Sequence, residues 1–403
     1  MRRWTGMLSF AGTALYLFGT PGVVAAASAP QVTGVKGGEI AFGMSGPFSG
    51  PVRELGRQMK IGVETAFAAQ NQAGGVHGRK LTLASADDGY DPERTKVAVR
   101  DLVEKRNVFG LVGSVGTATA AVAVPYALEK GILFFGALSG DDLLRNDPPD
   151  RFVFNYRASS WEESAAMVKY LVEVRRIRPS QIAVFAQQDA YGDAGFEGVA
   201  YMMRKYRYDP SRVVRVGYKR NTTDVVEAVR IVKQSASKIR AVVMVPTYKA
   251  AARFIQKVKN ENLDLVFSSV SSVGPTELAE ELMQLGPRYA EGVMVTQVVP
   301  LPTSKATAIL RYHQDLSRYA ATQKPNSVSL EGYLMASLLI EGLRRAGTDL
   351  NTDTLVTALE SIRQYDIGIG TLLSFGPSEH QASHKVWLTT LDGQGAYRAI
   401  RFE

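Results

Sequence analysis

The chain has 403 residues, of which 45% are hydrophobic and 21% are charged, and it contains no cysteine. This composition is typical of a folded globular protein and excludes a disordered or collagen-like chain. The lack of cysteine excludes a disulfide framework, and it also excludes a lipid attached through a cysteine near the N-terminus. The formal net charge is +8, but the basic residues are scattered in short clusters such as residues 175–178 (RRIR). We therefore expect no nucleic-acid partner, although a basic surface attracts anionic ligands.

The N-terminus has the pattern of an export signal. A basic start at Arg2 and Arg3 is followed by a mostly apolar stretch over residues 7–17 and by the small residues Ala25–Ala29. The apolar core is shorter than the roughly 20 residues that span a bilayer, and no later stretch resembles a membrane span. We therefore predict a cleavable signal peptide over residues 1–27 and a periplasmic mature chain that is neither inserted in the membrane nor lipid-anchored.

From Glu39 onward, short apolar runs alternate with longer amphipathic segments, which predicts an α/β fold with mostly parallel sheets. In the first half we predict strands over residues 39–44, 80–86, 109–112, 132–137 and 152–156, and helices ending near 73, 107 and 130. After Trp161 the same rhythm restarts. Strands are predicted there over residues 181–186, 212–218, 241–245, 263–267 and 292–299, with helices between the first four of them. Helices over residues 305–320, 329–346 and 352–361 and a hairpin of residues 385–391 and 397–402 complete the chain.

One stretch, Phe109–Thr119 (FGLVGSVGTAT), predicts a ligand-binding turn. A buried strand end leads into the flexible run Gly113–Gly116, and hydroxyl residues then precede a helix. Free backbone N–H groups at such a helix start suit a carboxylate or another acceptor. An ordinary strand-to-helix loop would have the same local sequence, so this stretch alone leaves both interpretations open.

No catalytic or cofactor motif accompanies this turn. The sequence has no G-x-S-x-G elbow, no phosphate-binding loop and no G-x-G-x-x-G fingerprint, so we expect no enzyme and no cofactor. His380 and His384 are four residues apart, but they lie in a polar loop without cysteine, and we expect no metal there. Asp87 and Asp88 are better explained as caps of a strand-end turn than as catalytic carboxylates. An exported α/β enzyme, such as a hydrolase that uses the same crevice, remains the alternative.

Several segments together carry a family resemblance. In chain order they are IAFGMSGPFSGPVRELG, NQAGGVHGRKLTL, ADDGYDPERT, LVGSVGTATAAVA, KGILFFGALSG and AVFAQQDAYGDAGF. Their order and spacing resemble the branched-chain amino-acid (Leu/Ile/Val) binding proteins of ABC importers, which have the type I periplasmic binding fold. The resemblance covers nearly the whole chain from Gly38.

The resemblance implies two Rossmann-like lobes that are joined by three crossovers and close on a ligand. The implied N-terminal lobe is residues 38–158 plus 297–372, and the C-terminal lobe is residues 159–296 plus 373–403. It also implies a small-molecule ligand, delivery to an inner-membrane ABC permease, and a monomer.

The resemblance places the ligand on strand-end loops of both lobes. The implied ligand-binding residues are Leu55, Ser114, Thr117, Ala118, Thr119, Leu138, Ser139, Gly140, Trp161, Tyr191, Thr247, Tyr248 and Ser271. One departure concerns the loop 270–274 (VSSVG), where amino-acid binders of this family usually have an acidic side chain. A buried ammonium group needs such a partner. The ligand is therefore a branched-chain or other amino acid, or a related carboxylate or amide without an amine.

Overall fold

The computed structural model describes Met1 and residues 33–400, so the predicted signal peptide lies outside the described residues apart from Met1. The described residues from 33 onward belong to one compact unit. No helix among them is long and apolar enough to cross a membrane.

The first sheet has six strands and is parallel except at one edge hairpin. Its strands are β1 (Val35–Lys36), β2 (Glu39–Gly46), β3 (Lys80–Asp87), β4 (Gly110–Val112), β5 (Leu133–Phe135) and β6 (Val153–Phe154). Strand β2 pairs with β1, β3 and β4, and the order then continues through β5 to β6. Parallel pairing brings the carboxyl ends of β2, β3, β4 and β5 to the same edge, where ligand loops of open α/β sheets lie.

The second sheet has seven strands in the order β13-β12-β11-β10-β9-β7-β8. Its strands are β7 (Ile182–Gln187), β8 (Arg215–Tyr218), β9 (Ala241–Val245), β10 (Val266–Ser269), β11 (Met294–Gln297), β12 (Trp387–Leu391) and β13 (Tyr397–Ile400). Every residue of β7 and β9 is buried, which is typical of parallel strands covered by helices on both faces. The final hairpin joins this sheet through the antiparallel pair β11–β12.

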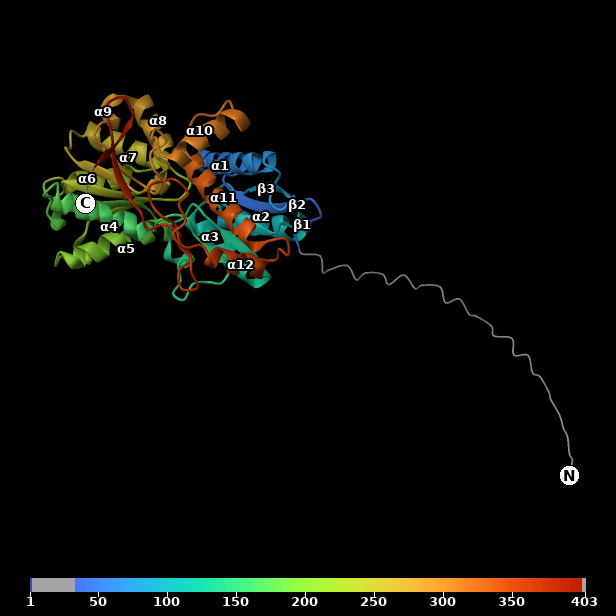
Figure 1. The fold of residues 1–403 in the computed structure, drawn as a ribbon. Coiled ribbons are helices and arrows are strands. Elements are labelled where there is room, and N and C mark those ends of the chain that lie inside the picture. Colours follow the sequence, from blue (N-terminus) through green and yellow to red (C-terminus); the bar gives the residue numbers. More distant parts are fainter. Residues whose placement is uncertain (2–32, 401–403) are drawn as a thin grey trace. The chain divides into compact units, whose positions relative to one another are not determined.

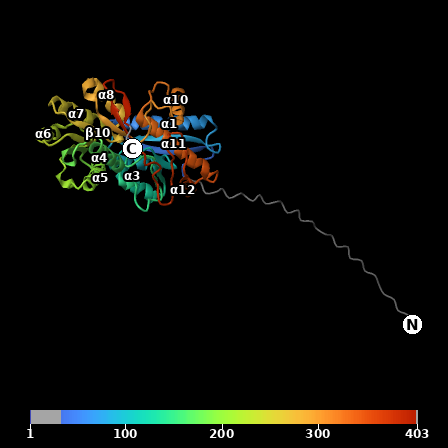
Figure 2. The same cartoon turned by 60° about the vertical axis from the view of Figure 1, so that its left-hand side comes forward.

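The helices form two groups, one for each sheet. Figures 1 and 2 show α4–α8 on one side, and α1, α3 and α10–α12 on the other. The first group is α4 (Ser160–Glu173), α5 (Ala190–Lys205), α6 (Val226–Gln234), α7 (Tyr248–Asn260) and α8 (Pro275–Leu285), followed by the short α9 (Pro287–Ala290). The second is α1 (Arg53–Gln72), α2 (Pro92–Arg100), α3 (Thr117–Lys130), α10 (Thr307–Tyr319), α11 (Ser327–Ala346) and α12 (Thr352–Glu360).

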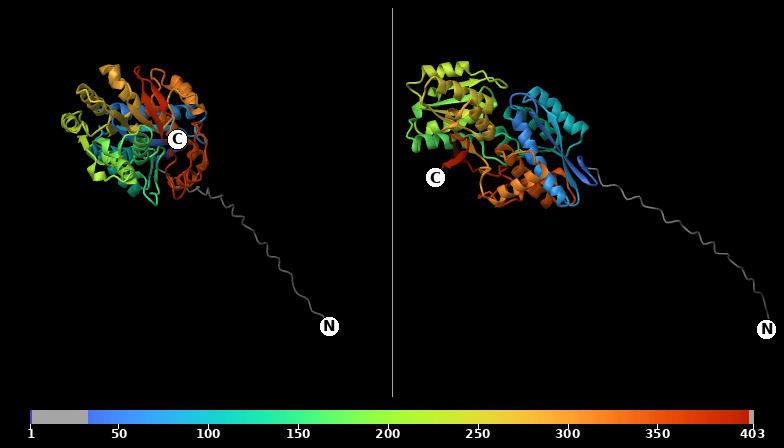
Figure 3. Two further views of the ribbon diagram at one scale, coloured as in Figure 1. Left: turned by 90° about the vertical axis from the view of Figure 1, so that its left-hand side faces the viewer. Right: turned by 90° about the horizontal axis from the view of Figure 1, so that it is seen from above.

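The chain passes between the two groups of elements three times. It leaves the first sheet after β6 for the second, returns after β11 to form α10–α12, and goes back at β12. Figure 3 shows the result from above, with the green and yellow segments on one side and the blue and teal segments on the other.

Two glycines let α1 and α11 approach closely. A Cβ atom at Gly62 would lie 2.0 Å from the carbonyl oxygen of Ser329, and one at Gly332 would lie 2.6 Å from that of Met59. Side chains at these positions would force the helices apart. Helix α11, although it comes late in the sequence, is therefore packed tightly against the first helix of the fold.

Most predicted elements are present with small shifts at their ends. Helix α8 was not predicted, because its acidic sequence PTELAEELMQL follows the loop 270–274 without an obvious capping residue. The predicted helix from Pro92 to residue 107 is also not uniform, since its last turns form a π-helix over Asp101–Lys105.

Candidate ligand-binding site

The turn between β4 and α3 depends on two glycines with left-handed backbones. Gly113 has φ 66° and Gly116 has φ 105°, a region that residues with side chains rarely adopt. A Cβ atom on Gly116 would also lie 2.3 Å from the ring of Tyr90. The chain can therefore turn sharply here and start α3 directly after the strand.

The start of α3 presents unused hydrogen-bonding groups. The N–H groups of Thr117, Ala118 and Thr119 belong to the first turn and have no acceptor within the helix. No side chain caps them. Ser114, immediately before, is 5% exposed, and its hydroxyl has no hydrogen-bond partner. A buried hydroxyl beside the positive end of a helix is suited to a carboxylate ligand.

The loop after β5 lies against this helix start. The hydroxyls of Thr117 and Ser139 are 2.8 Å apart, and the Leu138 N–H donates to the Ser114 carbonyl at 2.8 Å. Gly140 continues the loop, and its carbonyl accepts from the Ser160 N–H at 2.8 Å. The hydroxyl of Thr119, in contrast, donates to the carbonyl of Val115 and stabilises the turn itself.

The second sheet contributes a hydrogen-bonded group of its own. The Tyr191 hydroxyl, which is buried, donates to the carbonyl of Pro246 at 3.1 Å and lies 3.0 Å from the Ser272 hydroxyl. Thr247 is held by Tyr218, whose hydroxyl accepts from the Thr247 N–H at 2.8 Å. These contacts join the strand-end loops after β7, β9 and β10.

The loops of the two sheets touch one another. The Tyr248 hydroxyl donates to the carbonyl of Pro51 at 2.8 Å, and the Asn221 amide donates to that of Gly89 at 3.1 Å. Leu55 is 2% exposed, and a Cβ atom on Gly274 would lie 2.6 Å from its Cδ2 atom. Loops that follow strands of the two sheets are therefore in direct contact, and Leu55 and Tyr248 are the predicted ligand residues at this contact.

A buried charge cluster lies where the chain first crosses between the sheets. Arg157 is 1% exposed, and its guanidinium lies 3.3 Å from the carboxylate of Glu163 and 3.6 Å from that of Glu331. It also donates to the Ser271 hydroxyl. The other Glu163 oxygen accepts from the Ser271 N–H at 2.7 Å. The loop expected to carry an acid thus receives one from α4.

Burial and neighbouring charges both act on the acids of this cluster. Burial raises the pKa of Glu331 to about 6, and Arg157 opposes that rise. A second guanidinium, that of Arg145, donates to the Arg157 carbonyl at 3.0 Å and also opposes the rise in the Glu331 pKa. The cluster was missed in the sequence. One available signal was Glu331, a single acidic residue in the buried first half of α11.

A further buried carboxylate connects α8 to α11. One oxygen of Glu277 accepts from the Asn326 side-chain amide at 2.6 Å, and the other has no hydrogen-bond partner. Burial raises the pKa of Glu277 to about 7. Helices from the two groups of elements therefore meet at a carboxyl that titrates near neutral pH.

Trp161 has contacts that the other predicted ligand residues do not share. Its ring packs on Tyr201 with the ring centres 4.9 Å apart. It also lines a cavity of about 540 Å³ with the loops 142–149 and 378–384, which none of the other predicted ligand residues lines.

The remaining polar motifs have structural roles. Asp87 accepts from the Gly89 N–H at 3.0 Å and Asp88 accepts from the Tyr90 N–H at 2.9 Å, so both side chains cap the strand-end turn as expected. His380 contacts the carbonyl of Val153 and His384 the carboxylate of Glu162. Within residues 33–400, no group of three or more potential metal ligands was found.

Comparisons with known proteins agree with this geometry. The family model described as "Periplasmic binding protein" matches residues 39–396. Among solved structures, a possible leucine/isoleucine/valine-binding protein from Rhodopirellula baltica is 34% identical, with a TM-score of 0.86 over 93% of this chain and 98% of that one. A branched-chain amino acid transporter substrate binding protein from Streptococcus pneumoniae, solved in complex with isoleucine, is 16% identical with a TM-score of 0.74, over 90% of this chain and 99% of that one.

A curated relative, the Leu/Ile/Val-binding protein homolog 3 of Brucella melitensis, is 24% identical over 83% of this chain and 86% of its own length. The predicted fold class, the α/β fold of type I periplasmic binding proteins, is confirmed by the solved structures. The chain belongs to the periplasmic binding protein family.

Proposed function

We propose that the mature chain is the periplasmic binding protein of an ABC importer, and that it captures a small amino acid between two lobes and delivers it to an inner-membrane permease. The proposed lobes are residues 38–158 plus 297–372 and residues 159–296 plus 373–403. The division of strands between the two sheets supports these boundaries, since β12 and β13 join the second sheet. In this proposal the chain acts as a monomer and catalyses no reaction.

The observation that carries this proposal is the unpartnered hydroxyl of Ser114 beside the uncapped start of α3. A buried hydroxyl that lacks a partner costs free energy, and a ligand carboxylate would supply the missing acceptor. The N–H groups of Thr117 and Ala118 would complete the same carboxylate site. The first lobe therefore holds the acid end of the ligand.

The charge cluster supports an amine at the other end of the ligand. Glu163 and Glu331 place two buried carboxyl groups beside the crossover, and their oxygens would accept from a ligand ammonium group. Glu163, which accepts from the Ser271 N–H, would take the place of the acid that is absent from the loop 270–274. Two relatives are named a Leu/Ile/Val-binding protein homolog and a leucine-, isoleucine-, valine-, threonine-, and alanine-binding protein, and these names support a small, mostly aliphatic side chain. Leu55 and Leu138, both buried, would contact such a side chain.

Calorimetric titration of the purified mature chain tests this function. Leucine, isoleucine and valine are compared with 4-methylpentanoate, which lacks the amine, and with leucinamide, which lacks the carboxylate. We expect saturable binding of at least one amino acid and loss of binding for both analogues. Ser114→Ala should weaken binding by about tenfold or more, because one donor to a charged group is lost.

Ser317→Ala is the matched control, since Ser317 is exposed on α10. Equal affinity for leucine and 4-methylpentanoate would show that the site does not recognise the amine, and would contradict the proposed role of the charge cluster. Chemical conversion of any bound ligand would support the enzymatic alternative instead.

A further inference from the structure

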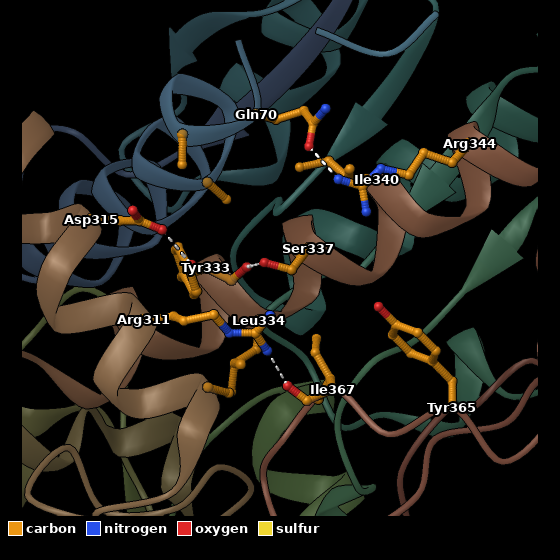
Figure 4. Close-up of a pocket in the computed structure, with 13 residues that line it drawn as sticks. Gln70, Arg311, Asp315, Tyr333, Leu334, Ser337, Ile340, Arg344, Tyr365 and Ile367 are labelled. Atoms are coloured by element: carbon orange, nitrogen blue, oxygen red, sulfur yellow. Dashed lines mark hydrogen bonds between the residues drawn. The ribbon is translucent and has the colours of Figure 1, made fainter. Parts of the chain in front are cut away.

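A separate cavity of about 220 Å³ lies among the helices that cover the first sheet, away from the strand-end loops. It is formed by α1, α10 and α11 with the segment around Tyr365, and none of the predicted ligand residues lines it (Figure 4). Its apolar wall includes Ala66, Ala69 and Ala308, whose small side chains leave the helices room for a hollow.

Two arginines line the cavity with more donors than the protein uses. Arg311 donates to the carbonyl of Ile367 at 2.5 Å and makes no ion pair within 4.0 Å to any described residue. Arg344 donates to the side-chain oxygen of Gln70 at 2.6 Å, and its other terminal nitrogen lies 3.8 Å from the carboxylate of Glu341. Since each guanidinium has five N–H groups, both have donors left for a further acceptor.

The other polar groups of the cavity also favour an acceptor. Figure 4 shows the Tyr365 hydroxyl directed into the hollow between the two arginines. The acid in the lining, Asp315, already accepts from the Tyr333 hydroxyl at 2.6 Å. Glu341 lies outside the lining and pairs with Arg344 at 3.8 Å, so the spare N–H donors of the two guanidinium groups are the feature that suits an oxyanion.

We propose that this cavity is a second small-molecule site, which binds a small oxyanion, a carboxylate or a phosphate, between Arg311 and Arg344. The Tyr365 hydroxyl donates to the same ligand. A planar guanidinium fork matches the oxygen geometry of both kinds of anion. The site is independent of the ligand that binds between the lobes.

Inorganic phosphate and succinate are the two probes, each titrated into the mature chain against sodium chloride of equal ionic strength. Thermal unfolding and calorimetry are the readouts. We expect saturable binding of one probe or both, and a loss of affinity of about tenfold or more in Arg311→Gln and in Arg344→Gln. The probe that binds identifies the source of the oxyanion.

Two controls separate this site from other effects. Arg230→Gln removes an exposed arginine that pairs with Glu227 on α6, and it should leave anion binding unchanged. Ser114→Ala should also leave it unchanged, because that residue belongs to the site between the lobes. Arg344 is half exposed, so its variant keeps the test valid if Arg311→Gln does not fold. No saturable binding of either probe, or the same binding in all four variants, would overturn the proposal.

Discussion

Replacing Glu277 by glutamine should remove a pH dependence of stability that is built into the contact between α8 and α11. Burial raises the pKa of this carboxyl from 4.5 to about 7, and the nearby acids Glu280 and Glu54 add to the rise. The folded protein therefore holds the proton more tightly than the unfolded chain does. Glu277 leaves the free energy of unfolding unchanged below pH 4.5, where it is protonated in both states, and lowers it as the pH rises towards 7. At about 1.4 kcal/mol per pKa unit, the loss reaches about 3 kcal/mol above pH 7.

The glutamine variant keeps the acceptor for the Asn326 amide, which donates at 2.6 Å, but cannot ionise. Urea unfolding of wild type and variant between pH 4 and pH 8.5 measures the difference. The variant should match the wild type near pH 4 and exceed it by about 3 kcal/mol at pH 8.5. Glu280→Gln, at an exposed position of the same helix, should change stability little at any pH. A constant difference between wild type and Glu277→Gln across this range would refute the reasoning.

Three other substitutions test the packing and the site. Arg157→Met removes the cation that lies next to Glu163 and Glu331, and it should lower the free energy of unfolding, measured in urea, by about 3–5 kcal/mol. A change near zero would contradict the burial of this cluster. Gly62→Ala places a Cβ atom 2.0 Å from a carbonyl of α11 and should lower the melting temperature, whereas Gly37→Ala, with no atom within 4 Å, should not. Trp161→Ala should leave amino-acid affinity unchanged, because Trp161 lines a cavity that none of the other predicted ligand residues lines. A large loss of affinity would show that Trp161 contacts the ligand.

The sequence predicted the strands well because parallel strands that are covered on both faces appear as short, uniformly apolar runs. The predicted strand 241–245 coincides with β9, and the predicted strand 181–186 differs from β7 by one residue; every residue of both strands is buried. The turn after β4 was also predictable, since Gly113 and Gly116 occupy backbone conformations that require glycine.

The charged contacts could not be predicted in the same way. Arg157 meets Glu331 across 174 positions of the chain, and no local pattern specifies such a pair. The acid that the loop 270–274 lacks comes from Glu163, which in the sequence is an ordinary member of the first turn of a helix. Long-range side-chain contacts depend on the packing of whole helices, and periodicity contains no information about them.

The most direct test of the central claim is a titration of leucine, isoleucine and valine into the mature chain and into Ser114→Ala under the same conditions. We predict saturable binding of at least one of these amino acids to the wild type, weakened by about tenfold or more in the variant. Equal affinity of both proteins, or no binding of any of the three, would contradict the proposal that the helix start behind Ser114 holds the carboxylate of an amino acid.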